Sequence, residues 1–233
     1  MRYARQVAMQ EIGKDGQEKL AKAQVLVVGA GGLGLPVLTY LACAGVGCLT
    51  IVEDDIVEES NLNRQFLYTP ADIGKPKGAL ARERLAALNP AIKVSWIGER
   101  LTQANAAPLV SGRDAVVDCV DNIATRLLAN DACLRANVPL VEAGIDGFYG
   151  YVFPVLRGGA CLRCLGYAEI ASPKSPGAIG CTAGVIGSLE ASVCIRLLLG
   201  MPVAPDMLTY DGTRMEFENV RIFRNEGCRH GEG

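Results

Sequence analysis

The chain has 233 residues, half of them hydrophobic and 6% aromatic, and its formal net charge at pH 7 is −2. This length and composition suit one aliphatic-cored α/β enzyme domain. The small net charge gives no electrostatic reason to expect nucleic acid or an anionic membrane as partner. The N-terminus is charged from its second residue, and we expect no apolar run close to the roughly 20 residues that span a bilayer. These features predict a cytoplasmic protein without a secretory leader.

Strands and helices are predicted to alternate along the first 143 residues. Aliphatic or alternating runs predict strands over residues 24–29, 48–53, 93–97, 115–120 and 138–143. Helices are predicted from a glycine turn to about residue 44, over 77–88 and over 124–136. This order predicts βαβ units in a Rossmann-like, doubly wound, mostly parallel α/β sheet.

The pattern changes in the C-terminal third of the chain. Residues 147–156 alternate without a following helix, which predicts an antiparallel strand. Residues 167–180 are rich in Pro, Ser and Gly and are predicted to form a crossover loop. A long apolar helix is predicted over 183–199, and short strands finish the chain. We therefore expect a single domain over 1–233.

A glycine-rich turn, GAGGLG, joins the first predicted strand to the first helix. Gly29, Gly31 and Gly34 have the spacing that lets a backbone turn tightly and approach a phosphate at a helix N-terminus. Glu53, at the end of the second predicted strand, is placed to accept hydrogen bonds from ribose hydroxyls. The turn alone would also suit a strand–helix connection without a ligand. Together with Glu53, it favours a nucleotide site.

An NAD-dependent dehydrogenase is the usual interpretation of such a turn. Polar clusters further along the chain favour phosphate chemistry instead. The motif SNLNRQ follows the second strand, Lys75 and Lys77 stand at a helix start, and DCVDN ends a later strand. Ligands bind at this edge of an open α/β sheet, and cations with a carboxylate suit phosphate charge and magnesium. The one histidine, His230, is near the end of the chain.

Five motifs in the same order resemble those of the ubiquitin-activating enzyme family. They are RY-x-RQ, GAGGLG, SNLNRQ, DIGKPK and DCVDN, and the resemblance runs from Arg2 to Cys228. The resemblance is to the short bacterial members of that family, the HesA/MoeB/ThiF sulfur-carrier-protein adenylyltransferases. The resemblance implies an enzyme that uses ATP and Mg²⁺ to convert the C-terminal glycine carboxylate of a small ubiquitin-like carrier protein into an acyl adenylate, with release of pyrophosphate. Such a step needs positioning and charge neutralisation rather than a protein nucleophile.

The resemblance also implies roles for individual residues. The nucleotide would be bound by Gly29, Gly31, Gly32, Gly34, Glu53, Asp55, Asn61, Arg64, Gln65, Lys77, Asp121 and Asn122. The catalytic set would be Arg5, Arg64, Lys77, Asp121 and Cys181. Asp121 would coordinate magnesium, and Arg5 would reach the site of the neighbouring subunit of a homodimer. The family more often has Asp where this chain has Glu53, which shifts the geometry slightly. Each charged residue could instead be an ordinary solvated surface charge.

The nine cysteines fall into three groups. Five lie in apolar patterns and are expected to pack as small hydrophobic residues; they are Cys43, Cys48, Cys119, Cys133 and Cys194. Cys161 and Cys164 form a Cys-x-x-Cys pair, and the resemblance implies that Cys228 and His230 complete a structural zinc site; loss of the metal is the alternative. Cys181 precedes the long helix, whose N-terminus stabilises a thiolate, although a partly buried structural cysteine is equally compatible.

The implied partners are a carrier protein ending in Gly-Gly and a sulfurtransferase or cysteine desulfurase. Residues 1–145 would bind ATP, and 146–233 would bind the carrier and zinc. The C-terminal segment leans slightly toward the molybdopterin-synthase type rather than the thiamine type, and other sulfur-insertion pathways stay open. Two other functions remain as alternatives: a nucleotide-linked oxidoreductase, and a non-catalytic scaffold subunit of an activating enzyme.

Overall fold

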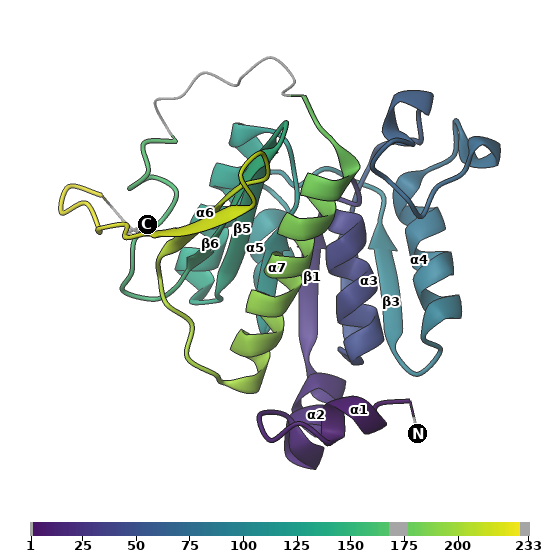
Figure 1. Cartoon of the computed structure of the whole chain (residues 1–233), viewed down its shortest axis with the longest axis horizontal. Helices are drawn as coiled ribbons and strands as arrows, with labels where there is room; N and C mark the ends of the chain where they lie inside the picture. The colour runs from purple at the N-terminus through teal and green to yellow at the C-terminus, as the bar shows by residue number, and fades with distance from the viewer. Residues whose placement is uncertain (1, 168–176, 229–233) are drawn as a thin grey trace.

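An eight-stranded mixed sheet forms the centre of the molecule (Figure 1). The computed structural model describes residues 2–167 and 177–228. The strand order is β3-β2-β1-β4-β5-β6-β7-β8. The parallel strands are β1 (Gln24–Val28), β2 (Cys48–Val52), β3 (Lys93–Ile97), β4 (Ala115–Asp118) and β5 (Leu140–Asp146). The antiparallel strands are β6 (Tyr149–Val155), β7 (Met207–Asp211) and β8 (Glu216–Val220). The predicted fold class is confirmed.

Helices cover both faces of the parallel part, and the core lies against β1 on both sides. Val25 and Val27 pack on one face with the apolar residues of α3 (Gly34–Ala44), α4 (Lys77–Leu88) and α7 (Gly180–Leu199). Leu26 and Val28 pack on the other face with α5 (Ala106–Val110) and α6 (Ile123–Ala136). Because successive strand residues point to opposite faces, an unbroken aliphatic run is what a strand buried on both sides requires.

Two helices precede the sheet and were not predicted from the sequence: α1 (Ala4–Val7) and α2 (Gly13–Lys22). Figure 1 shows both at the end of β1 where that strand begins. The helix α2 is polar except for a few positions, but Leu20 is fully buried and its carbonyl accepts the Gly47 N–H at 2.9 Å. Tertiary contacts therefore hold a segment that has little apolar periodicity of its own.

The helix α7 is long and apolar enough, by length and composition, to cross a membrane. The expectation that the chain has no such run is therefore wrong. In the fold, α7 packs beside α3 and against β5 and β6, and it buries Ile186, Glu190 and Cys194. A buried glutamate and this packing on two sides make α7 an interior helix of the sheet assembly.

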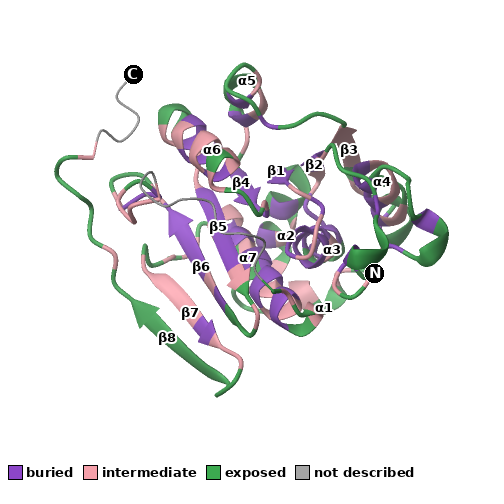
Figure 2. Ribbon diagram, turned by 90° about the horizontal axis from the view of Figure 1, so that it is seen from above, coloured by how far each residue is buried: buried purple, intermediate pink, exposed green. Residues whose placement is uncertain are grey.

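Burial decreases along the antiparallel strands from β6 through β7 to β8 (Figure 2). Most residues of β6 are buried, whereas all residues of β8 are exposed. Most of the predicted crossover loop over 167–180 lies outside the described residues.

Candidate active site

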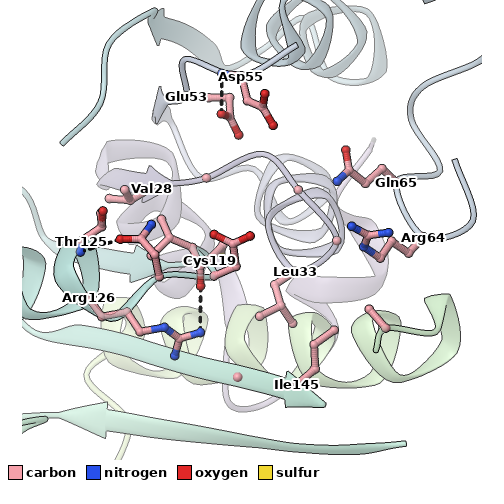
Figure 3. Close-up of a pocket in the computed structure, with 18 of the residues that line it drawn as sticks. Val28, Leu33, Glu53, Asp55, Arg64, Gln65, Cys119, Thr125, Arg126 and Ile145 are labelled. Carbon is pink, nitrogen blue, oxygen red and sulfur yellow. Dashed lines mark hydrogen bonds between the residues drawn. The ribbon is translucent and has the colours of Figure 1, made fainter. Parts of the chain in front are cut away.

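A cavity of about 1150 Å³ opens at the carboxyl ends of the parallel strands (Figure 3). Its lining comes from the segments that follow β1, β2, β3 and β4 and from the end of β5. The strand order reverses its direction between β1 and β4, and the crevice at such a reversal is where open α/β sheets bind ligands. The cavity is large enough for a nucleotide with part of a second substrate.

The glycine turn has the tight backbone that its spacing predicts. Gly29 has a φ of +99°, in the left-handed region that favours glycine. A Cβ atom on Gly34 would lie 2.1 Å from the Gly29 carbonyl oxygen, so no side chain fits there. This packing places the N-terminus of α3 against the cavity, where free backbone N–H groups favour an anion.

Glu53 fastens the glycine turn to the end of β2. Its two carboxylate oxygens accept hydrogen bonds from the Ala30 N–H at 2.7 Å and the Asp55 N–H at 2.9 Å. The side chain is half-buried and lines the cavity. A carboxylate oxygen accepts more than one hydrogen bond, so the same group has capacity for ribose hydroxyls.

The two cations predicted to meet phosphate both line the cavity. Arg64 donates from one nitrogen to the Ser60 carbonyl and the Asn63 side chain, at 2.9 Å each, and its methylene groups lie beside Gly32. Lys77 is only 4% exposed and forms an ion pair with Asp55. Partial burial would raise the pKa of Asp55, but the Lys77 ammonium lowers it overall.

Asn61 and Gln65 are both buried in the cavity wall. The Asn61 side chain accepts the Glu58 N–H at 3.0 Å and closes a capping box in η1 (Glu59–Asn61). Gln65 lies beside Gly31, and within the described part of the chain its Oε1 has no hydrogen-bond partner. Asn61 is thus engaged locally, whereas Gln65 holds an unsatisfied acceptor at the glycine turn.

Sequence reasoning missed the side chains that hold the loop between β2 and α4. Asp72, in η2 (Pro70–Asp72), is 4% exposed, pairs with Arg84 at 2.6 Å and accepts the Thr69 hydroxyl at 2.8 Å. Burial alone would raise the pKa of Asp72, but these donors lower it to about 2. The only signal in the sequence was the run of polar residues around the predicted helix start.

Asp121 and Asn122 are exposed at the end of β4 and both line the cavity. Asn122 caps α6 by accepting the Thr125 N–H at 2.9 Å. Behind them, burial raises the pKa of Asp118 to about 6 and holds the pKa of Glu190 well above its ordinary value. The sequence placed Asp118 in the DCVDN motif and Glu190 in an apolar helix, and neither pattern gave a reason to expect a buried carboxyl group.

The cavity continues past Asp121 along β6 and β7. This extension is lined by Tyr149, Tyr151, Thr209, Tyr210 and Asp211. These residues belong to the antiparallel strands β6 and β7. The cavity therefore has one end formed by the glycine turn and a tyrosine-rich other end.

Two of the predicted catalytic residues do not line this cavity. Arg5 is exposed on α1, at the opposite end of β1 from the glycine turn (Figure 1). Cys181 is exposed in the first turn of α7. It lines a second cavity of about 670 Å³ between α3 and α7, with Tyr40 and Phe66.

Three of the four predicted zinc ligands converge. The sulfur atoms of Cys161, Cys164 and Cys228 all lie within 4.8 Å of one another. Cys161 is 3.9 Å from Cys164 and 3.7 Å from Cys228, close to the roughly 3.8 Å between thiolates that ligate one tetrahedral zinc ion. The Asn225 N–H donates to Cys164 at 3.3 Å, a hydrogen bond of the kind that supports metal-bound thiolates. The arrangement fits zinc; His230 lies outside the described residues.

The remaining cysteines only partly follow the prediction. Cys119, Cys133 and Cys194 are buried, as expected for small apolar residues. Cys43 is exposed and Cys48 is half-buried, so the expectation was wrong for Cys43.

Comparison with known proteins identifies relatives over nearly the full chain. The ThiF family model matches residues 3–230. The chain is 44% identical to the sulfur carrier protein adenylyltransferase of Thermus thermophilus, over 97% of this chain and 89% of that protein. It is 40% identical to the sulfur carrier protein ThiS adenylyltransferase of Escherichia coli (98% and 93% covered) and 39% identical to the molybdopterin-synthase adenylyltransferase of the same organism (98% and 94% covered).

Among solved structures, the fold is similar to that of Escherichia coli MccB determined with ATP. The TM-score is 0.86 over 100% of this chain and 75% of that chain, at 24% identity. At this identity, the likeness concerns the fold.

Proposed function

The chain belongs to the ThiF family, and from this premise we propose that it is an ATP-dependent adenylyltransferase acting on a small ubiquitin-like sulfur-carrier protein. The observation that carries the proposal is the continuous cavity: a glycine turn, Arg64, Lys77 and Asp121 surround one end, and the tyrosine-rich end gives access for a second substrate. Family membership argues against the dehydrogenase interpretation of the glycine spacing.

In the proposed reaction the C-terminal glycine carboxylate of the carrier attacks the α-phosphorus of ATP. A new bond forms between a carboxylate oxygen and that phosphorus, the bond to the bridging oxygen breaks, and pyrophosphate leaves. The glycine turn and α3 N-terminus would hold the phosphates, and Glu53 the ribose. Arg64 and Lys77 would offset the charge that develops on the phosphate oxygens. Release of Lys77 from Asp55 would free its ammonium for this purpose.

Magnesium, when bound at Asp121, would neutralise phosphate charge and orient the pyrophosphate leaving group. Asp121 suits this role because its carboxylate is exposed to the cavity, whereas the neighbouring Asp118 is buried with a raised pKa. By capping α6, Asn122 would fix the direction of the segment between β4 and α6 that carries Asp121. The other nucleotide-binding roles that the family resemblance implies, for Asp55, Asn61 and Gln65, belong to the same proposal.

Arg5 would complete the cavity of a second copy of the chain in a homodimer. Its position outside its own cavity supports a role in trans.

Cys181 would take part in a later sulfur-transfer step, in which a sulfurtransferase or cysteine desulfurase supplies the sulfur. Residues 1–145 would bind ATP, and residues 146–233 would bind the carrier. Zinc would be held by Cys161, Cys164, Cys228 and His230. A chain with nine cysteines and no disulfide among its described residues suits the reducing cytoplasm.

The test is ATP–pyrophosphate exchange with purified carrier proteins that end in Gly-Gly, added one at a time. We expect exchange with one carrier, and mass spectrometry should then detect that carrier as its adenylate. The same carrier without its terminal glycine is the control and should give no exchange. The carrier that supports exchange would also decide between the molybdopterin and thiamine pathways. The proposal would be contradicted if none of the carriers supported exchange, or if an Asp121→Ala variant showed unchanged exchange.

A further inference from the structure

Arg126 is a buried arginine that joins three elements at the wall of the cavity. It belongs to α6, and its guanidinium donates to the Val120 carbonyl at 2.8 Å and to the Tyr151 hydroxyl oxygen at 3.0 Å. It also forms an ion pair with Glu142 of β5. Figure 3 shows this side chain directed at the segment that follows β4. None of the motifs in the sequence pointed to it.

The backbone of Val120 is held on both sides. Its N–H donates to Asp118 Oδ1 at 3.2 Å, and its carbonyl accepts from Arg126. Two residues later, Asn122 is fixed by its cap to Thr125. Asp121 lies between these fixed points, so the direction of its exposed side chain depends on contacts made by its neighbours.

Contacts with β5 and β6 fix the Arg126 side chain. Glu142 is fully buried and stands opposite Asp118 in the parallel pairing of β5 with β4. Tyr151 donates its hydroxyl to Glu142 at 2.8 Å. A guanidinium offers several donors in a rigid plane, and here these contacts leave it one orientation, with one nitrogen toward Val120.

We propose that Arg126, itself held by Glu142 and Tyr151, is a positioning residue that orients Asp121 for magnesium by binding the Val120 carbonyl. The inference rests on the proposed function, in which Asp121 coordinates magnesium. Arg126 acts through the backbone and does not itself touch the metal. Loss of a group that orients a metal ligand commonly costs 10–100-fold in metal affinity or activity.

The experiment measures magnesium dependence in Arg126→Gln and in the double variant Arg126→Gln/Glu142→Gln. The double variant removes the Glu142 charge that loss of Arg126 would leave unpaired, which protects the fold if the single variant unfolds. We expect the magnesium concentration for half-maximal ATP–pyrophosphate exchange to rise by about 10-fold or more, with an unchanged KM for the carrier. Calorimetry should show weaker binding of ATP with magnesium and unchanged binding of ATP without metal.

Arg113→Gln is the matched control. Arg113 is also an arginine that donates to a backbone carbonyl, that of Leu109 at 3.1 Å, but it does not line the cavity. Its substitution should leave the magnesium dependence unchanged. Arg126→Lys keeps the charge without the planar fork and should recover only part of the loss.

Two outcomes would overturn the inference. One is an unchanged magnesium dependence in folded Arg126 variants. The other is an effect confined to the KM for the carrier, which would mean that Arg126 contacts the carrier directly. An Asp121→Ala variant separates this failure from failure of the proposed function. If Asp121→Ala abolishes exchange while the Arg126 variants keep normal magnesium dependence, only the positioning role is wrong.

Discussion

Single side chains outside the cavity hold the segments that carry Arg64 and Lys77. Asp72 is an example, because its bonds to Arg84 and Thr69 close the loop that carries Arg64 and leads into Lys77. The loop buries Val57 and Tyr68 in the core, and the charge-assisted hydrogen bonds of Asp72 add to this by holding the base of the loop.

Replacement of Asp72 with Asn should destabilise the protein in a pH-dependent way. Its pKa falls from 3.8 in the unfolded chain to about 2 in the fold. The carboxylate therefore stabilises the fold fully above pH 3.8, and this contribution is lost as the pH falls through about 2. The shift corresponds to about 2 kcal/mol of unfolding free energy.

Denaturant unfolding at pH 7 and at pH 2 would check this. The difference between wild type and Asp72→Asn should be about 2 kcal/mol at pH 7 and should shrink toward zero at the lower pH. Glu83→Gln, at an exposed position of α4, is the control and should change stability by less than about 0.5 kcal/mol. An equal loss at both pH values would mean that the Asp72 charge is not the cause.

At the scale of elements, periodicity predicted the central segments well. The predicted helix over 77–88 and strand over 93–97 coincide with α4 and β3. The strand predicted over 138–143 is β5, which extends to Asp146 because β6 pairs with it through a hairpin. Pairing partners set strand ends, and a local pattern does not contain them.

The glycine turn between β1 and α3 should not tolerate a methyl group at Gly34. A Cβ atom there would overlap the Gly29 carbonyl oxygen, so strand and helix would have to move apart. We expect Gly34→Ala to lower the unfolding free energy by about 3 kcal/mol and to weaken ATP binding, measured by denaturation and calorimetry.

Gly184→Ala is the matched control for this prediction. Gly184 lies inside α7 and a Cβ atom there meets no atom within 4 Å. Alanine should stabilise the helix by about 0.5–1 kcal/mol. If Gly34→Ala behaved like Gly184→Ala, the close packing of the turn would not be what requires glycine.

At the scale of the whole molecule, the cysteine cluster joins parts of the chain that are 67 residues apart. If zinc binds there, purified protein should contain about one zinc ion per chain, and Cys228→Ser should lower both the zinc content and the melting temperature. Elemental analysis and thermal unfolding measure the two effects. Cys43→Ser, at an exposed site away from the cluster, should change neither. Full zinc content in Cys228→Ser would exclude that ligand.

A homodimer with shared sites predicts that two inactive variants restore each other. Arg5→Ala and Asp121→Ala should each lack exchange activity alone. In a mixed dimer, one cavity would contain Asp121 from one chain and Arg5 from its partner. Random mixing should return about a quarter of wild-type activity. Mixed subunits that form heterodimers but stay inactive would show that Arg5 does not act in trans.

The sequence by itself determined the alternation of strands and helices, the glycine turn and the motifs that follow each parallel strand. These features depend on local periodicity and short-range backbone sterics, which are determined by residues close together in the sequence. Only the tertiary structure decided that Arg64, Lys77 and Asp121 line one cavity while Arg5 and Cys181 do not. It also brought Arg126 against Val120 and Cys161 against Cys228. Such contacts follow from strand order and packing across the sheet, which arise from interactions between distant parts of the chain.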